Sequence, residues 1–278
     1  MHKFGLIGYP IAHSLSPALF KAAYGGRFRY DLLENEDFGA AFSCFMRSYD
    51  AVNVTAPFKE NAFEKAKFRS VEAELCGAAN ILVKTPRGLS CFNSDCSAVR
   101  SLLDRAGDIG SVLVVGCGGA GKAAAAAAYA LGLDVTLMNR GMVKALDFAR
   151  RLNASRDSFG TGFPGPGPRG GRTGDVTVLP VERFAEALCR HDALVYTLPV
   201  PLESFPFLPL PGPAGPSSLK LVVEANYRDP SFTHEVLGRL PSSVEHVSGK
   251  EWLLRQALYG YGLMTGINPD PQAMASRI

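Results

Sequence analysis

Short hydrophobic runs alternate along this chain with amphipathic stretches of helical length. Strand-like runs at residues 4–7, 51–54 and 112–115 are separated by stretches such as 17–24 and 59–68, in which apolar positions follow the helical repeat. Between residues 80 and 92, two strand-like runs flank the turn-forming sequence Thr85-Pro86-Arg87-Gly88, which predicts a hairpin. The pattern predicts an α/β fold whose first part contains a mixed sheet.

From residue 111 the pattern becomes that of a Rossmann-like unit, with a strand at 112–116, a Gly-rich turn, an Ala-rich helix to 131 and a strand at 134–138. Further buried strands are predicted at 175–179, 193–197 and 221–224, with a helix at 181–190. A long helix at 250–264 and a short tail helix end the chain. We expect an N-terminal α/β domain over residues 1–97, to which 248–278 returns, a doubly wound domain over 98–247, and a cleft between them.

Composition and charge narrow the class of partner. The 278 residues are 47% hydrophobic and 20% charged, and 29 basic against 26 acidic residues give a net charge of +3 with no basic block. We therefore expect a small-molecule partner rather than nucleic acid or a membrane. The Gly- and Pro-rich stretches 160–174 and 206–216 are predicted to be surface loops.

The six cysteines indicate the cellular compartment. They form no CxxC pair and no Cys/His spacing suited to zinc, which predicts reduced thiols and no metal site. The first residues lead directly into a predicted strand without a signal core, and the Ala-rich run at 123–133 is too short to cross a bilayer. These features predict a cytoplasmic protein.

A candidate nucleotide site follows the strand at 112–116. Residues 116–121 read GCGGAG, a GxGxxG match that opens a helix whose N–H groups and dipole can hold a pyrophosphate. The alternative is a Gly-rich turn that only allows close helix packing. Where NAD-binding folds usually place an acid, this chain has Asn139 and Arg140, and Lys144 follows on the next helix, which we expect to start at Gly141. Two cations favour the 2′-phosphate of NADP, although a basic helix start can also be plain surface.

Lys59 is a candidate for proton transfer. Pro57 is a natural first helical residue, which would place Lys59 in the first turn, where the helix dipole disfavours the ammonium and should lower its pKa. Such a lysine suits proton transfer or binding of an anionic substrate. A solvated lysine beside Glu60 is the alternative, and this segment alone leaves both interpretations open.

Other polar residues have structural explanations of their own. Asp95 lies between a predicted strand and a helix at 97–105, so a helix N-cap is the simplest interpretation. Ser16, before a proline, is also a predicted N-cap, whereas Ser14 has no such role, and two hydroxyls in one loop could bind a carboxylate. Gln256 falls on a predicted packing face of the last long helix.

Taken in order, several motifs resemble those of the shikimate dehydrogenase family over nearly the whole chain. They are GYPIAHSLSP at 8–17, NVTAPFKE at 53–60, GAAN at 77–80, NSD at 93–95, the glycine turn, NR at 139–140, and Gln256. The resemblance implies an NADP-dependent enzyme that reversibly reduces 3-dehydroshikimate to shikimate in chorismate and aromatic amino-acid biosynthesis. It also implies a monomer or homodimer with the nicotinamide between its lobes.

The resemblance also assigns roles to residues. Lys59 and Asp95 would form the catalytic pair. Substrate would be bound by Ser14, Ser16, Thr55, Asn80, Tyr227 and Gln256. Cofactor would be bound by Gly116, Gly118, Gly119, Ala120, Asn139, Arg140 and Lys144.

The chain departs from the family pattern at a few places. The sequence YTLPV at 196–200 stands where the family has an Asn-rich turn, and Glu251-Trp252 replaces Gly-Met before Gln256; both are expected near the nicotinamide. Ala98 replaces a glycine, and the insertion at 160–174 has no family counterpart.

Three other functions compete with this interpretation. A quinate/shikimate dehydrogenase that uses NAD is disfavoured by Ser16, Arg140 and Lys144, and a non-catalytic shikimate sensor by the intact Lys59 and Asp95. A Rossmann reductase with an unrelated substrate would require the motifs of the first domain to be coincidental.

Overall fold

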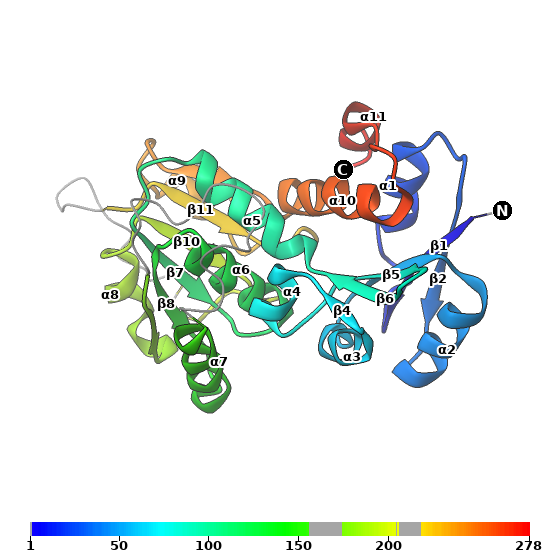
Figure 1. Cartoon of the computed structure of the whole chain (residues 1–278). Coiled ribbons are helices and arrows are strands. Elements are labelled where there is room, and N and C mark those ends of the chain that lie inside the picture. Colours follow the sequence, from blue (N-terminus) through cyan, green and yellow to red (C-terminus); the bar gives the residue numbers. More distant parts are fainter. Residues whose placement is uncertain (1, 156–173, 204, 206–217) are drawn as a thin grey trace. The chain divides into compact units, whose positions relative to one another are not determined.

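Two units make up the structure, a computed structural model that describes residues 2–155, 174–203, 205 and 218–278 (Figure 1). One unit comprises Met1–Ala98 with Leu254–Ile278, and the other comprises Val99–Leu253. Helices α5 (Ser94–Arg105) and α10 (Gly249–Thr265) each begin in one unit and end in the other. The domain limits expected from the sequence, 97/98 and 247/248, remain predictions; by contacts, the first turn of α10 belongs to the second unit.

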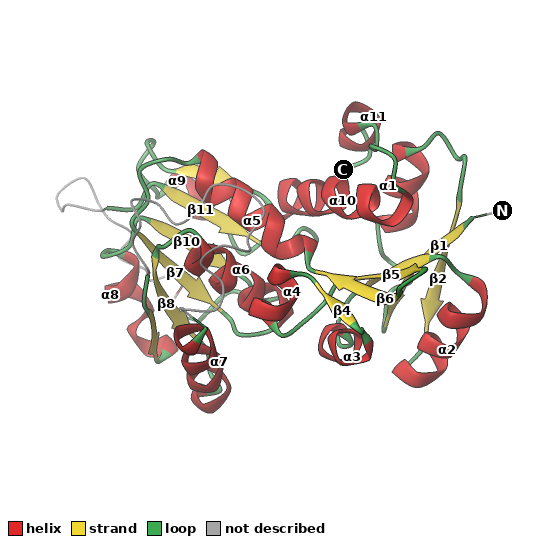
Figure 2. Cartoon of the chain, in the orientation of Figure 1, coloured by secondary structure: helices red, strands yellow, loops and turns green. Residues whose placement is uncertain are grey.

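The first unit contains a mixed six-stranded sheet in the order β2-β1-β3-β5-β6-β4. Figure 2 shows strands in yellow and helices in red. Its strands are β1 (Lys3–Gly8), β2 (Arg29–Glu34), β3 (Ala51–Val54), β4 (Phe68–Arg69), β5 (Ile81–Thr85) and β6 (Gly88–Phe92). Strand β5 runs antiparallel to β3 and β6, and the other neighbours are parallel. The predicted hairpin and mixed sheet are confirmed.

Short helices complete this unit: α1 (Ser16–Ala23), α2 (Phe38–Ser48), α3 (Lys59–Lys65), α4 (Val71–Cys76) and α11 (Pro271–Ala275). Helix α2 begins where the Asp37 carboxylate accepts the N–H groups of Gly39 and Ala40, and it packs on β1 and β2. Fully buried Ile7, Val52 and Leu82 lie in the adjoining core. The expected helix at 59–68 is too long, because the chain leaves α3 after Lys65 and pairs with β6 as β4.

The second unit contains a sheet whose strands are all parallel, in the order β12-β11-β10-β7-β8-β9. Its strands are β7 (Ser111–Val115), β8 (Asp134–Met138), β9 (Val176–Leu179), β10 (Ala193–Tyr196), β11 (Leu221–Glu224) and β12 (Glu245–Val247). The strand order reverses between β7 and β10, as in doubly wound nucleotide-binding folds. The expected Rossmann-like sheet is confirmed, and its switch point lies at the carboxyl ends of β7 and β10.

Helices of the second unit are α6 (Gly119–Ala130), α7 (Met142–Ala154), α8 (Phe184–Leu188) and α9 (His234–Gly238). The six alanines at 123–128 of α6 are fully buried, and this small-residue helix packs on β7, β8 and β10. The helix predicted at 181–190 is instead a 3-10 turn, η2 (Val181–Arg183), followed by the short α8.

The predicted loops at 160–174 and 206–216 lie outside the described residues, except for Gly174. Within the described ranges, no helix combines the length and the apolar character needed to cross a membrane.

Candidate active site

Lys59 and Asp95 form an ion pair in the first unit. The Lys59 Nζ atom lies 2.6 Å from Asp95 Oδ2, and the two side chains are only 16% and 13% exposed. The same Oδ2 atom accepts a second hydrogen bond, of 3.0 Å, from Asn80 Nδ2. A charge-assisted bond of this length, with water largely excluded, holds the ammonium at a defined position beside a carboxylate.

The starts of helices α3 and α5 explain why the Lys59 and Asp95 side chains can pair with each other. Helix α3 begins at Lys59 itself, with Phe58 as its N-cap, so the expectation that Pro57 is the first helical residue is wrong. The expectation that Asp95 caps α5 is also wrong, because Asn93 Oδ1 accepts the N–H of Cys96 at 3.1 Å. Asp95 therefore lies inside the first turn, and its carboxylate can pair with Lys59.

Asn80 joins the pair to two further polar side chains. Asn80 Oδ1 accepts the Ser94 N–H at 2.8 Å, and Asn80 Nδ2 donates to Ser94 Oγ at 2.9 Å. Gln256 Oε1, on α10, accepts from Ser94 Oγ at 3.0 Å and from Asn80 Nδ2 at 3.5 Å. The chain reaches Asn80 because Gly77, at φ +59°, ends α4 in the left-handed conformation.

This cluster changes two interpretations based on the sequence. Gln256 was expected on a packing face, but its amide oxygen bonds to the polar cluster. Ser94 is fully buried and was not predicted as a site residue, although it lies between Asn93 and Asp95 in the NSD motif identified from the sequence. Its role depends on contacts with residues distant in the sequence.

Ser14 and Ser16 lie on the loop after β1, and Thr55 lies after the neighbouring strand β3. The N-cap of α1 is Leu15, so Ser16 is the first helical residue rather than the cap. Ser14 has the structural role instead, since its Oγ accepts the Ser16 N–H at 3.2 Å. Because β1 and β3 are parallel neighbours, the loop after β1 and the residues after β3 leave the same edge of the sheet. The two segments lie close together there, since a Cβ on Gly8 would lie 2.4 Å from the Thr55 methyl.

The glycine turn of the second unit has the geometry of a phosphate-binding loop. Gly116 has φ +106°, and a Cβ on Gly121 would lie 1.9 Å from the Gly116 carbonyl oxygen, so both positions require glycine. A Cβ on Gly118 would meet no protein atom within 4 Å. Gly118 is the N-cap of α6 and no side chain caps that helix, which leaves backbone N–H groups for an anionic ligand.

Asn139, Arg140 and Lys144 follow strand β8. Asn139 Oδ1 accepts the Cys117 N–H at 3.2 Å and its Nδ2 donates to the Gly141 carbonyl at 3.1 Å, so Asn139 ties this loop to the glycine turn. Helix α7 starts at Met142, one residue later than expected, with Gly141 as its N-cap. Arg140 and Lys144 are exposed. An open Gly118, an uncapped helix start and two cations fit a dinucleotide with an additional phosphate.

Tyr227 lies in the second unit, on the loop after β11. The buried Glu224 accepts the N–H groups of Ser231 and Phe232, the latter at 3.4 Å, and Asn226 Nδ2 donates to the carbonyls of Pro199 and Asp229 at 3.0 and 2.7 Å. Burial raises the pKa values of Glu224 and Tyr227. The half-buried Tyr227 is therefore carried on a loop anchored at both ends.

Two departures from the family pattern lie in the interior. Tyr196 is fully buried against Phe205 and Phe232, its hydroxyl donates to the Val200 carbonyl at 2.8 Å, and burial raises its pKa to about 12. Trp252 is 3% exposed. Within the divergent segment 196–200, Thr197 lies against the glycine turn, since a Cβ on Gly116 would lie 2.3 Å from Thr197 Oγ1.

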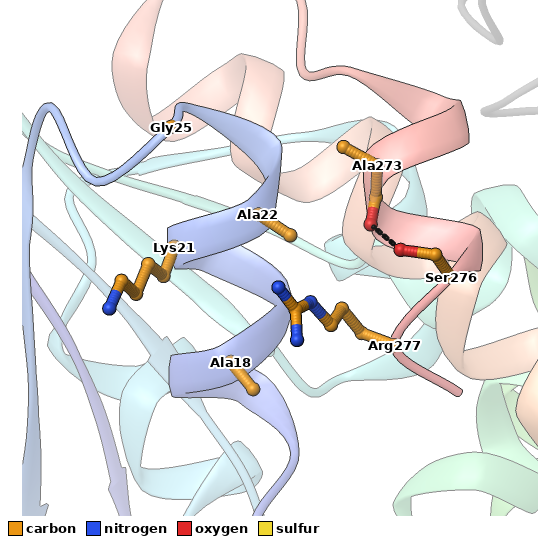
Figure 3. Close-up of a pocket in the computed structure, with 7 residues that line it drawn as sticks. All are labelled: Ala18, Lys21, Ala22, Gly25, Ala273, Ser276 and Arg277. Atoms are coloured by element: carbon orange, nitrogen blue, oxygen red, sulfur yellow. Dashed lines mark hydrogen bonds between the residues drawn. The ribbon is translucent and has the colours of Figure 1, made fainter.

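A cavity of about 390 Å³ lies elsewhere in the first unit, between α1 and α11 (Figure 3). Small side chains line it together with Lys21 and Arg277, and Arg277 reaches toward α1. None of the candidate site residues lines this cavity.

The doubly wound sheet with its glycine turn and the buried lysine–aspartate pair define a class: α/β oxidoreductases that use a nicotinamide dinucleotide. Residues 6–82 match the model of the shikimate dehydrogenase substrate binding domain. A shikimate dehydrogenase (NADP(+)) of Thermus thermophilus is 31% identical over an alignment of 282 positions, which covers 99% of this chain and 96% of that protein. The chain belongs to the shikimate dehydrogenase family.

Solved structures agree with this assignment. The T. thermophilus shikimate 5-dehydrogenase in complex with NADP(H) and shikimate has a TM-score of 0.76 at 27% identity, with 100% of this chain and 98% of that chain covered. A quinate dehydrogenase from Corynebacterium glutamicum in complex with NAD has a TM-score of 0.78 at 22% identity, covering 99% and 98%. The second likeness concerns the fold alone.

Proposed function

We propose that this protein is an NADP-dependent shikimate dehydrogenase, which reversibly reduces 3-dehydroshikimate to shikimate in chorismate and aromatic amino-acid biosynthesis. The observation that carries the proposal is the mostly buried pair of Lys59 and Asp95, joined through Asn80 and Ser94 to Gln256. A sensor that only binds shikimate has no need of a proton-transfer pair, so the pair supports an enzyme. Family membership supports the substrate and the cofactor.

Lys59 moves the proton in this proposal. Hydride transfer between NADP and a ring carbon leaves the substrate oxygen in need of a proton in one direction and of an acceptor in the other. Lys59 Nζ supplies or accepts it, and Asp95, 2.6 Å away, holds the ammonium in place. Asn80, Gln256 and Thr55 bind the ring hydroxyls, whereas Ser14 and Ser16 bind the carboxylate.

Cofactor binding belongs to the second unit. The backbone N–H groups at Gly118, Gly119 and Ala120 hold the pyrophosphate, while Gly116 and Asn139 shape the turn. Arg140 and Lys144 bind the 2′-phosphate and so select NADP over NAD. The first unit is then the substrate-binding domain and the second the NADP-binding domain. The six cysteines, all without disulfides, support a cytoplasmic location.

One assay tests the proposal. Cofactor reduction is followed by absorbance with shikimate and with quinate, each offered with NADP and with NAD. We expect turnover confined largely to shikimate with NADP. A preference for quinate or NAD would assign the protein to the quinate/shikimate class, and binding of shikimate without turnover in any combination would indicate a sensor.

A further inference from the structure

The main chain at Ser16 is held by a residue far away in the sequence. The loop after β1 has internal bonds, in which Ser14 Oγ accepts the Ser16 N–H at 3.2 Å and the Ser14 N–H donates to the Ile11 carbonyl at 2.9 Å. A further bond comes from α10, where the Tyr261 hydroxyl donates to the Ser16 carbonyl at 3.1 Å. The serine loop is thereby tied to the helix that also carries Gln256.

Packing fixes the Tyr261 hydroxyl in space. The residue is 1% exposed, and its ring lies edge-on to Phe20, with centroids 4.9 Å apart and planes at 72°. Phe20 belongs to α1, the helix that begins at Ser16. Burial raises the pKa of Tyr261, so the hydroxyl remains a proton donor. A buried ring packed against Phe20 and a hydroxyl that stays protonated make a stable support for the carbonyl.

The neighbouring Tyr30 is arranged in the same way. Its ring packs on Phe20 at 4.6 Å, and its hydroxyl donates to Asn53 Oδ1 at 2.9 Å. Asn53 is buried on β3, two residues before Thr55. Two tyrosines around one phenylalanine therefore support both chain segments that leave this edge of the sheet.

We propose that Tyr261 is a positioning residue for substrate binding, which acts by holding the Ser16 carbonyl so that the Ser16 hydroxyl faces the substrate carboxylate. The proposal rests on the proposed function, because it takes Ser14 and Ser16 as the carboxylate ligands. Tyr261 itself does not touch substrate. Through Tyr261 and Gln256, one helix sets the positions of groups for two parts of the substrate.

Tyr24 offers a matched control. It belongs to the same aromatic cluster, 5.0 Å from Phe20, and its hydroxyl contacts Thr265 Oγ1 at 2.8 Å and the Ile267 carbonyl at 3.1 Å. Its described bonds thus involve neither Ser16 nor Asn53. Tyr24→Phe and Tyr261→Phe each remove one phenol hydroxyl from the cluster, so they share any general effect on packing.

The test compares Tyr261→Phe, Tyr24→Phe, Ser16→Ala and the double variant Tyr261→Phe/Ser16→Ala in the shikimate and NADP assay. We expect Tyr261→Phe to raise the KM for shikimate about fivefold, the effect of one neutral hydrogen bond, with kcat within about twofold. Tyr24→Phe should leave KM unchanged. In the Ser16→Ala background, Tyr261→Phe should have an effect below about twofold, because the hydroxyl that it positions is absent.

Two results would overturn the proposal: an unchanged KM in Tyr261→Phe, or an equal effect with and without the Ser16 hydroxyl. Thermal unfolding of all variants separates these outcomes from a loss of folded protein. If the wild type itself fails to oxidise shikimate with NADP, the proposed function fails instead, so the two failures are distinguishable.

Discussion

Replacing Lys59 by two different residues separates its charge from its proton. Lys59→Arg retains a cation that can pair with Asp95, but a guanidinium does not give up a proton in proteins. Lys59→Met removes both the charge and the proton while keeping a side chain of similar length. The pair is mostly buried, and without Lys59 the Asp95 carboxylate would keep, among its hydrogen bonds to described residues, the 3.0 Å bond from Asn80.

The expected magnitudes differ for activity and stability. General acid–base catalysis contributes about 10²- to 10⁴-fold, so both variants should lose kcat by that factor, while the KM for shikimate changes much less. A hydrogen bond between charged groups is worth about 2 kcal/mol, which corresponds to a Tm decrease of roughly 4–8 °C in Lys59→Met. Lys59→Arg should unfold close to the wild-type temperature.

Absorbance at the reduced cofactor's band gives kcat and KM with shikimate and NADP, and calorimetry gives Tm. The decisive variant is Lys59→Arg, because its fold and ion pair are retained. If its kcat lies within about threefold of the wild type, Lys59 is not the proton-transfer residue. If instead kcat falls only in Lys59→Met, charge rather than the proton is what the site requires.

Three further predictions concern the second unit. In Gly121→Ala the new Cβ would meet a backbone oxygen at 1.9 Å, so we expect the free energy of unfolding, measured with denaturant, to fall by roughly 1–3 kcal/mol. Gly118→Ala has open space around its Cβ, so it should keep wild-type stability and raise the KM for NADP. Equal stabilities of the two variants would contradict the geometry. Arg140→Ala should raise the KM for NADP about tenfold or more and leave that for NAD nearly unchanged, and a parallel change with both cofactors would exclude a 2′-phosphate contact. Burial raises the pKa of Glu224, so the contribution of this carboxyl group to stability is largest below the ordinary carboxyl pKa of 4.5 and is lost as the pH rises through the raised value. The Tm of the wild type relative to that of Glu224→Gln should therefore be highest near pH about 4 and fall toward pH about 8. A Tm difference that stays constant with pH would refute this prediction.

Local sequence determined the elements whose signals are local. Apolar runs and the turn sequence at 85–88 predicted the strands and the hairpin, since strand pairing across a short turn involves residues close in the chain. The glycine turn could be predicted for the same reason: φ at Gly116 and the contact between Gly121 and Gly116 arise within six residues. The boundaries of short helices were less predictable, as the end of α3 at Lys65 instead of residue 68 shows.

The tertiary structure decided which polar side chains act together. From the sequence, the simplest interpretation of Asp95 and Ser16 was that they cap helices, and that of Gln256 was that it packs against a neighbouring element. Local sequence alone was sufficient to explain each of them. Folding gives the cap of α5 to Asn93 and brings Asp95 to within 2.6 Å of Lys59, 36 residues earlier. Contacts between Ser94 and Gln256, or between Tyr261 and Ser16, join residues more than 160 positions apart, and no local pattern encodes such pairs. Hydrophobic periodicity reports which face of an element is buried, whereas a site depends on where several buried faces meet, and only the packed chain determines that.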